Sequence, residues 1–273
     1  MNAKSLEPTL TLSQEELYFL LVLLKSRRIP GMEGIFEVDA SERERTNLLD
    51  AARRALVARG LVTLQVDGRA TMDEFTLAVI GTCVRPLFSV MMENTALDRS
   101  SGVFWHGIHG LIVEHTLPQQ GIHRFRALPA ETDLVRRIVG AAEVHPAESS
   151  LKLAEVMVME EAFVRARKAS HDEVDEKAAR DALERGGAPA GEAEKLAALL
   201  AQAETSTTVA FARRSYPEGG EELFGGTALS GPGGAILTVP TGTGSGEVRV
   251  RPLSRQEWRD WLAMMLELVQ ASE

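Results

Sequence analysis

Histidines are the residues of this chain whose type and spacing come nearest to a reactive or metal-binding site. Four of the six lie close together, at His106, His109, His115 and His123. Imidazole nitrogens bind Zn and Cu, so such a cluster first suggests a metal centre. No carboxylate or cysteine completes a ligand set at metal-binding spacing, and His106 and His109 flank a predicted turn. We therefore expect surface or interface histidines and no metal site.

Two other patterns could support chemistry, and neither does. The glycine-rich run from Gly242 to Gly246 joins two predicted strands, whereas a phosphate-binding loop must open a helix that presents free amides. Cys83 lies in an apolar helical pattern, which indicates an inert buried thiol. The chain also lacks a G-x-S-x-G elbow and an H-E-x-x-H motif. The sequence therefore predicts no catalytic residues, no cofactor and no enzymatic activity.

Composition limits the class of partner. The chain has 273 residues, of which 44% are hydrophobic and 25% charged, with a net charge of −9. This charge argues against binding of nucleic acid or of an anionic membrane surface. A single cysteine excludes an intrachain disulfide, and no apolar run approaches bilayer-spanning length. The N-terminal stretch also lacks a signal-peptide pattern, so we expect a soluble cytoplasmic protein.

The most informative pattern in the chain as a whole is an internal repeat. Two predicted β-hairpins end in Arg124-Phe125-Arg126-Ala127-Leu128 and in Arg249-Val250-Arg251-Pro252-Leu253, and a helical pattern follows each of them. Upstream, the segment 51–56 with Gly60 matches the segment 178–183 with Gly187. Matching elements in the same order indicate one unit that has been duplicated.

The repeat predicts an α+β fold with internal duplication and quasi-two-fold symmetry. The first repeat spans 1–145, with a helical, winged-helix-like part at 11–86 and a β-meander plus helix at 87–142. The second spans 146–273, with a helical part at 147–204 and a β-meander plus helix at 205–271. Short polar or glycine-containing links make both meanders antiparallel.

Local signals set the expected helix boundaries. Capping boxes, in which a serine or threonine and an acidic residue three positions on satisfy free amides reciprocally, predict helix starts. They occur at Ser13, Ser41, Ser170 and Ser254, and Thr71 is expected to cap a further helix. Other helices are predicted at 128–142, with Pro129 in the first turn, and at 147–167. Residues 1–10 are predicted to be a frayed tail.

A second interpretation concerns the segment 11–86. Its predicted order of two helices, a strand pair and a third helix is typical of a winged-helix domain, which makes a DNA-binding transcriptional regulator the alternative function. The recognition helix would be 41–59, with five arginines at Arg43, Arg45, Arg53, Arg54 and Arg59. Acidic residues alternate with them, so a phosphate-facing stripe is poorly formed. Winged-helix folds also serve in protein interaction.

With the repeat laid out, the whole chain resembles the EspG family, cytoplasmic chaperones of mycobacterial type VII (ESX) secretion. The residues that carry the resemblance are 10–17, the unit 124–129 and the tail from Val248 to Leu268. It implies a central antiparallel sheet flanked by helical bundles. It also implies binding of the apolar tip of a PPE protein in a PE–PPE heterodimer, which keeps that substrate soluble. The tight turn at 107–110 departs from the longer substrate-contacting loop of the family, which leaves the substrate class open.

A chaperone of this kind needs an exposed apolar surface, and a sheet face that helices leave uncovered would provide one. The expected partner-binding residues are Phe88, Val90, Met92, Phe104, Trp105, Val209, Phe211, Leu223 and Phe224. Only one strand face can point outward, so about half of this set belongs to the core. The predicted function is non-enzymatic binding of a helical secreted protein, and the sequence leaves a homodimer open.

Overall fold

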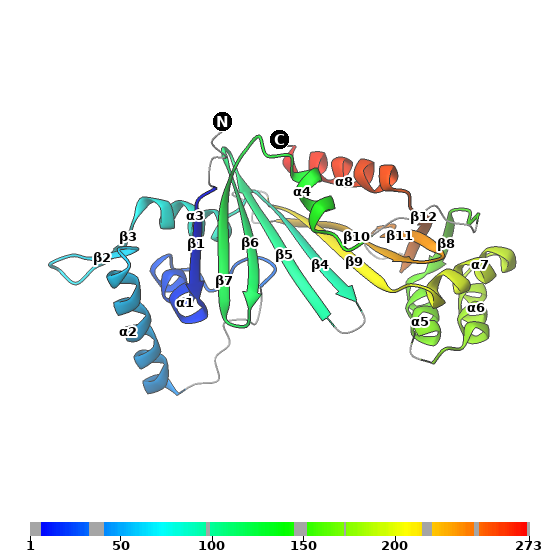
Figure 1. The fold of residues 1–273 in the computed structure, drawn as a ribbon, viewed down its shortest axis with the longest axis horizontal. Coiled ribbons are helices and arrows are strands. Elements are labelled where there is room, and N and C mark those ends of the chain that lie inside the picture. Colours follow the sequence, from blue (N-terminus) through cyan, green and yellow to red (C-terminus); the bar gives the residue numbers. More distant parts are fainter. Residues whose placement is uncertain are drawn as a thin grey trace. The chain divides into compact units, whose positions relative to one another are not determined.

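The chain folds around one large antiparallel sheet (Figure 1). The computed structural model describes residues 7–32, 41–96, 99–144, 152–171, 173–214, 220–242 and 246–271. Within these ranges, ten strands are hydrogen-bonded in the order β1-β7-β6-β5-β4-β9-β10-β11-β12-β8, and eight helices accompany them. The predicted α+β class with a central antiparallel sheet is confirmed.

The chain divides into two compact units built from interleaved segments. The first unit comprises Met1–Met91, Gly102–Thr132 and Ala212–Glu222, and the second comprises Met92–Ser101, Asp133–Phe211 and Leu223–Glu273. Strands β4, β5, β9 and β10 therefore each contribute residues to both units. The predicted repeats 1–145 and 146–273 divide the sequence differently from these two units. They stay a prediction.

In the first unit, five strands support three helices. The strands are β1 (Thr9–Ser13), β4 (Phe88–Ala96), β5 (Arg99–Ile108), β6 (Leu111–Gln119) and β7 (Ile122–Pro129). The helices are α1 (Gln14–Leu23), α2 (Glu42–Ala58) and α3 (Glu74–Val84), and a short hairpin pairs β2 (Val62–Leu64) with β3 (Ala70–Met72). Leu12, Leu17, Ile80 and Phe125 lie in one buried cluster. The core of this unit thus lies between the sheet and these helices.

In the second unit, helices lie on both faces of the sheet. The strands are β8 (Val156–Met159), β9 (Thr205–Arg214), β10 (Glu221–Gly231), β11 (Gly234–Pro240) and β12 (Glu247–Pro252). One face packs Leu229, Ile236 and Val250 against α5 (Glu160–His171), α6 (Glu176–Arg185) and α7 (Ala190–Ala201). The other face brings Phe211 to Trp261 of α8 (Arg255–Gln270), beside α4 (Leu134–Ala141), with ring centroids 5.8 Å apart.

Three capping boxes form as predicted. Ser13, Ser41 and Ser254 each accept a backbone N–H three residues on, while a glutamate at that position accepts the backbone N–H of the cap. The predicted turn between β5 and β6 also forms, because Ile108 pairs directly with Leu111. Gly110 in that turn has φ of 85°, a left-handed conformation that glycine adopts without steric cost.

Several predicted boundaries were wrong. The tail predicted at residues 1–10 ends in β1, because Leu10 and Leu12 alternate into the core opposite Phe125 and His123 of β7. The helix predicted at 147–167 is replaced over 152–159 by an extended segment and β8, whose Val156 and Val158 are buried. Residues 147–151 lie outside the described residues.

Three predicted helix starts were also misplaced. Pro129 ends β7, and α4 begins after Asp133, whose side chain accepts the N–H of Arg136. Ser170 lies in the last turn of α5, and Asp175 caps α6 instead. In place of Thr71, Asp73 caps α3. In each case a carboxylate nearer the apolar helical segment satisfies the free amides.

The two halves of the chain show the same order of elements, apart from the β2–β3 hairpin. In β7, Arg124 lies opposite Thr11 of the edge strand β1, and in β12, Arg249 lies opposite Met157 of the edge strand β8. The matching helices agree in burial, since Ala52 and Leu56 of α2 correspond to the buried Ala179 and Leu183 of α6. The internal duplication of the sequence stays a prediction. Among the described residues, no helix is both long and apolar enough to cross a bilayer.

Candidate partner-binding site

The nine residues predicted to bind a partner differ widely in exposure. Six of them are buried: Phe88, Val90, Met92, Trp105, Val209 and Phe211. Phe104 and Phe224 are half-buried, and Leu223 has 65% of its surface exposed. A buried side chain offers no area for docking in this conformation. Of this set, Leu223, Phe224 and Phe104 are the side chains that a partner could reach.

The histidine prediction was wrong for three of the four clustered residues. His106, His115 and His123 are fully buried in the first unit, on the sheet face that carries Val113 and Phe125, whereas His109 is exposed in the turn. His115 Nε2 lies 3.0 Å from His123 Nδ1, and His106 Nδ1 lies 2.9 Å from Ser89 Oγ. Strand alternation places all three on one buried face, whereas the sequence predicted surface or interface histidines.

Burial determines the protonation of these three imidazoles. Desolvation lowers the pKa of His106 from 6.5 to about 3, with a smaller contribution from Arg214. Desolvation likewise lowers the pKa of His115 and of His123, and in His115 the neighbouring histidines add to the effect. All three are therefore neutral core residues at neutral pH. Across the described ranges, no group of three or more His, Cys, Asp or Glu residues is arranged to hold a metal ion.

Cys83 is buried within α3, as the sequence predicted. Burial in apolar surroundings raises the pKa of its thiol, because the charged thiolate loses its hydration. A thiol without a thiolate fraction is a poor nucleophile, so Cys83 acts as a small core side chain.

The second unit contains a cleft of about 340 Å³ that sequence reasoning missed. We call it the α5 cleft, and its walls are α5, the end of α7, and the strands β4, β9 and β10. Its apolar lining is Ala96, Val164, Leu200, Ala203 and Leu229, and its polar lining is Thr95, Arg167, Lys168, His171, Glu204, Thr205 and Ser206. An apolar floor beside a basic rim can accept a group that is partly apolar and partly anionic.

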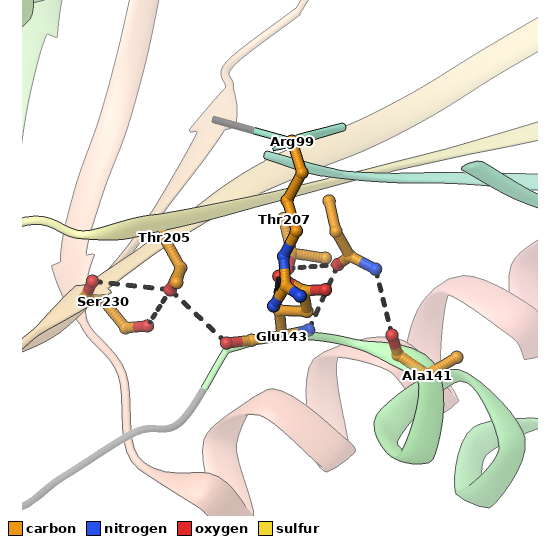
Figure 2. Close-up of polar contacts among 7 residues, drawn as sticks. Arg99, Ala141, Glu143, Thr205, Thr207 and Ser230 are labelled. Carbon is orange, nitrogen blue, oxygen red and sulfur yellow. Dashed lines mark hydrogen bonds and ion pairs between the residues drawn. The ribbon is translucent and has the colours of Figure 1, made fainter. Parts of the chain in front are cut away.

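A buried polar cluster holds the strands of the α5 cleft from the opposite sheet face (Figure 2). The Asn94 amide donates to the carbonyl oxygen of Ala141 at 3.0 Å. Its side-chain oxygen accepts from the Glu143 backbone N–H at 3.1 Å and from the Thr207 hydroxyl at 2.7 Å. Because side chains alternate along a strand, Asn94 and Thr207 point away from Thr95 and Ser206, which line the cleft.

A further contact joins two of the cleft strands through Thr205, which itself lines the cleft. The hydroxyls of Thr205 in β9 and Ser230 in β10 lie 2.7 Å apart, and Thr205 also donates to the Glu143 carbonyl (Figure 2). These bonds tie β4, β9 and β10 to the segment that follows α4. These hydrogen bonds thereby join the strands that line the α5 cleft.

One sequence signal could have revealed the α5 cleft. Val164, Arg167, Lys168 and His171 recur at helical spacing, so they form one stripe along α5. The predicted helix ended at 167, and the following capping box was assigned to Ser170. Because of this error, the stripe was divided between two predicted helices and was not recognised.

No protein-family model matches the chain, and no curated protein matches it. Among solved structures, the chain is similar to the Mycobacterium tuberculosis type VII secretion system chaperone EspG5, solved in complex with a PE25–PPE41 dimer. The TM-score is 0.65, the alignment covers 97% of this chain and 98% of that chain, and 13% of the aligned residues are identical. At this identity the likeness concerns the fold. The chain thus has the fold of a type VII secretion chaperone of the EspG kind, as its resemblance to that family implies.

Proposed function

We infer that this protein is a non-enzymatic cytoplasmic chaperone or adaptor. It binds a helical secreted protein of the PE–PPE kind and keeps that protein soluble before secretion by a type VII system. The observation that carries this inference is the correspondence with EspG5, which extends over nearly the full length of both chains. That protein was solved with a PE25–PPE41 dimer bound, so the same fold is known to hold such a partner.

Features of this chain agree with that role. The α5 cleft combines apolar and charged lining on strands that are joined by side-chain hydrogen bonds, and protein-recognition sites combine such surfaces. Leu223, Phe224 and Phe104 add apolar surface outside it. The buried histidines and Cys83 are neutral core residues, so the groups that first suggested chemistry serve packing instead.

No observation favours the alternative of a DNA-binding regulator. The helix predicted for recognition exists as α2, but two of its arginines bind carboxylates of the chain itself. Arg59 lies 2.7 Å from Glu16 and donates to the Thr11 carbonyl oxygen at 2.6 Å, and Arg53 lies 3.3 Å from Asp50. The Arg59 contacts hold the end of α2 against β1 and α1, and the Arg53–Asp50 pair lies within α2.

The experiment that tests the proposed function is affinity capture from the cytosol of the native organism, followed by mass spectrometry. We expect recovery of a small helical secreted protein, or a pair of them, in a stoichiometric complex at moderate salt. Recovery of nucleic acid, or of the protein alone, would contradict the proposal. Because binding of DNA is electrostatic, repeating the capture at high salt separates the two outcomes.

A further inference from the structure

The lining of the α5 cleft is richer in positive charge than the chain as a whole. The chain carries a net charge of −9. In the α5 cleft, by contrast, Arg167 and Lys168 provide two permanent cations against one carboxylate, Glu204, and His171 lies one turn further on. A local excess of positive charge in an acidic protein favours an anionic ligand at this place.

The apolar part of the cleft has an open side. Val164 lines it with 60% of its surface exposed. Deeper in, Leu200 and Leu229 are buried. A volume of about 340 Å³ is at the lower end of the range for ligand sites, enough for one large side chain and its flanks. An open rim suits a segment that continues outside the cleft better than an enclosed small molecule.

We propose that the α5 cleft binds an acidic helical segment of the protein partner, with one aliphatic or aromatic side chain on its apolar floor and carboxylates against Arg167 and Lys168. This rests on the proposed function and names the chemistry of its partner. The hydroxyls of Thr95 and Ser206 lie at the same wall and can donate to the same carboxylates. The cluster around Asn94 keeps the wall in place, so binding requires little reordering.

The cations have a second physical effect that the test must separate. Lys168 and His171 lie in the last turn of α5, where positive charge also stabilises the helix by compensating its dipole. Arg165 provides the control, because it is exposed on the same helix and does not line the cleft. A charge reversal at Arg165 therefore makes the same change in the charge of the helix and leaves the cleft lining unchanged.

The test uses the full chain and a fluorescein-labelled, alanine-based helical peptide of about 18 residues. The peptide carries one leucine, with a glutamate one turn before it and one turn after it. Two further peptides replace both glutamates with lysine, or the leucine with serine. Fluorescence anisotropy measures binding at low salt for the wild type and for Lys168→Glu, Val164→Ser and Arg165→Glu, and circular dichroism checks that each variant is folded.

We expect the acidic peptide to bind with a Kd below about 1 mM and the lysine and serine peptides to bind at least about tenfold more weakly. Lys168→Glu and Val164→Ser should each raise the Kd of the acidic peptide by about tenfold, and Arg165→Glu should raise it by less than about twofold. Val164 is exposed, so its replacement keeps the proposal testable even if Lys168→Glu fails to fold. Equal binding of all three peptides, no binding up to millimolar concentration, or equal effects of Lys168→Glu and Arg165→Glu would overturn the proposal.

The same variants separate this proposal from the proposed function. If Lys168→Glu and Val164→Ser captured the native partner as well as the wild type does, the chaperone role would stand and the cleft proposal would fall. If no partner were captured while the acidic peptide bound in the cleft, the proposed function would fall and the site would stand.

Discussion

Acid should destabilise this protein through its buried histidines, and His106 allows the size of the effect to be worked out. Its pKa is 6.5 in the unfolded chain and about 3 in the folded protein, because burial excludes the charged form. Between these values the unfolded state binds a proton that the folded state does not. The contribution of His106 to the free energy of unfolding is therefore complete above pH 6.5. It falls by about 1.4 kcal/mol per pH unit as the pH decreases toward 3.

At pH 5 this amounts to about 2 kcal/mol for His106 alone. The lowered pKa values of His115 and His123 act in the same direction. The assay is urea unfolding at pH 8 and at pH 5, followed by tryptophan fluorescence, because Trp105 is buried in the same unit. The perturbation is His106→Gln, and His109→Gln in the exposed turn is the matched control.

We expect the difference in unfolding free energy between pH 8 and pH 5 to shrink by about 2 kcal/mol in His106→Gln and to stay at the wild-type value in His109→Gln. A wild-type protein equally stable at both pH values would refute the reasoning, as would a variant with an undiminished difference. Either result would mean that the imidazole is hydrated or protonated in the folded protein.

Three further substitutions test the fold, with unfolding free energies as the measurement. Asn94→Ala removes three hydrogen bonds and leaves the buried Thr207 hydroxyl without its acceptor, so it should cost about 2–3 kcal/mol; a neutral effect would show that the polar cluster does not fix the strands. Gly107→Ala should cost about 1–3 kcal/mol, since its new methyl group would lie 2.1 Å from the Phe88 ring, and an unchanged stability would contradict that packing. Lys25→Gly should instead raise the free energy of unfolding by about 1 kcal/mol, because Lys25 follows α1 with φ of 53°, a left-handed conformation that favours glycine. A lower free energy of unfolding would mean that the lysine side chain contributes more than this backbone strain costs.

Much of the fold could be predicted from local patterns. The capping boxes at Ser13, Ser41 and Ser254 depend on residues within one turn, and all three form. The eight strands of the two predicted meanders are β4 to β7 and β9 to β12. They are long enough for alternation and turn residues to identify them. The two edge strands were missed because β1 and β8 have only five and four residues, respectively. A strand that short is fixed by pairing with a distant neighbour, and local sequence does not show that pairing.

The site could not be predicted in the same way, since exposure depends on what covers each sheet face. In β4, Phe88, Ser89 and Val90 are all buried, so alternation does not identify an outward face. His106 and Trp105 point to opposite faces and are both fully buried. The α5 cleft lies where α5, the end of α7 and three strands meet, and its lining comes from residues far apart in sequence. The stripe from Val164 to His171 is the one part of this lining that follows a local pattern, and the helix end predicted at 167 divided it.

The central claim is that this protein keeps a helical secreted partner soluble, and the most direct measurement is the solubility of that partner. The captured partner would be expressed in a heterologous host alone, with the wild-type chain, and with the Lys168→Glu variant. We predict that it is soluble only in a stoichiometric complex with the wild-type chain and that it aggregates alone or with the variant. A partner that is equally soluble in all three cases would contradict both the chaperone role and the part assigned to the α5 cleft.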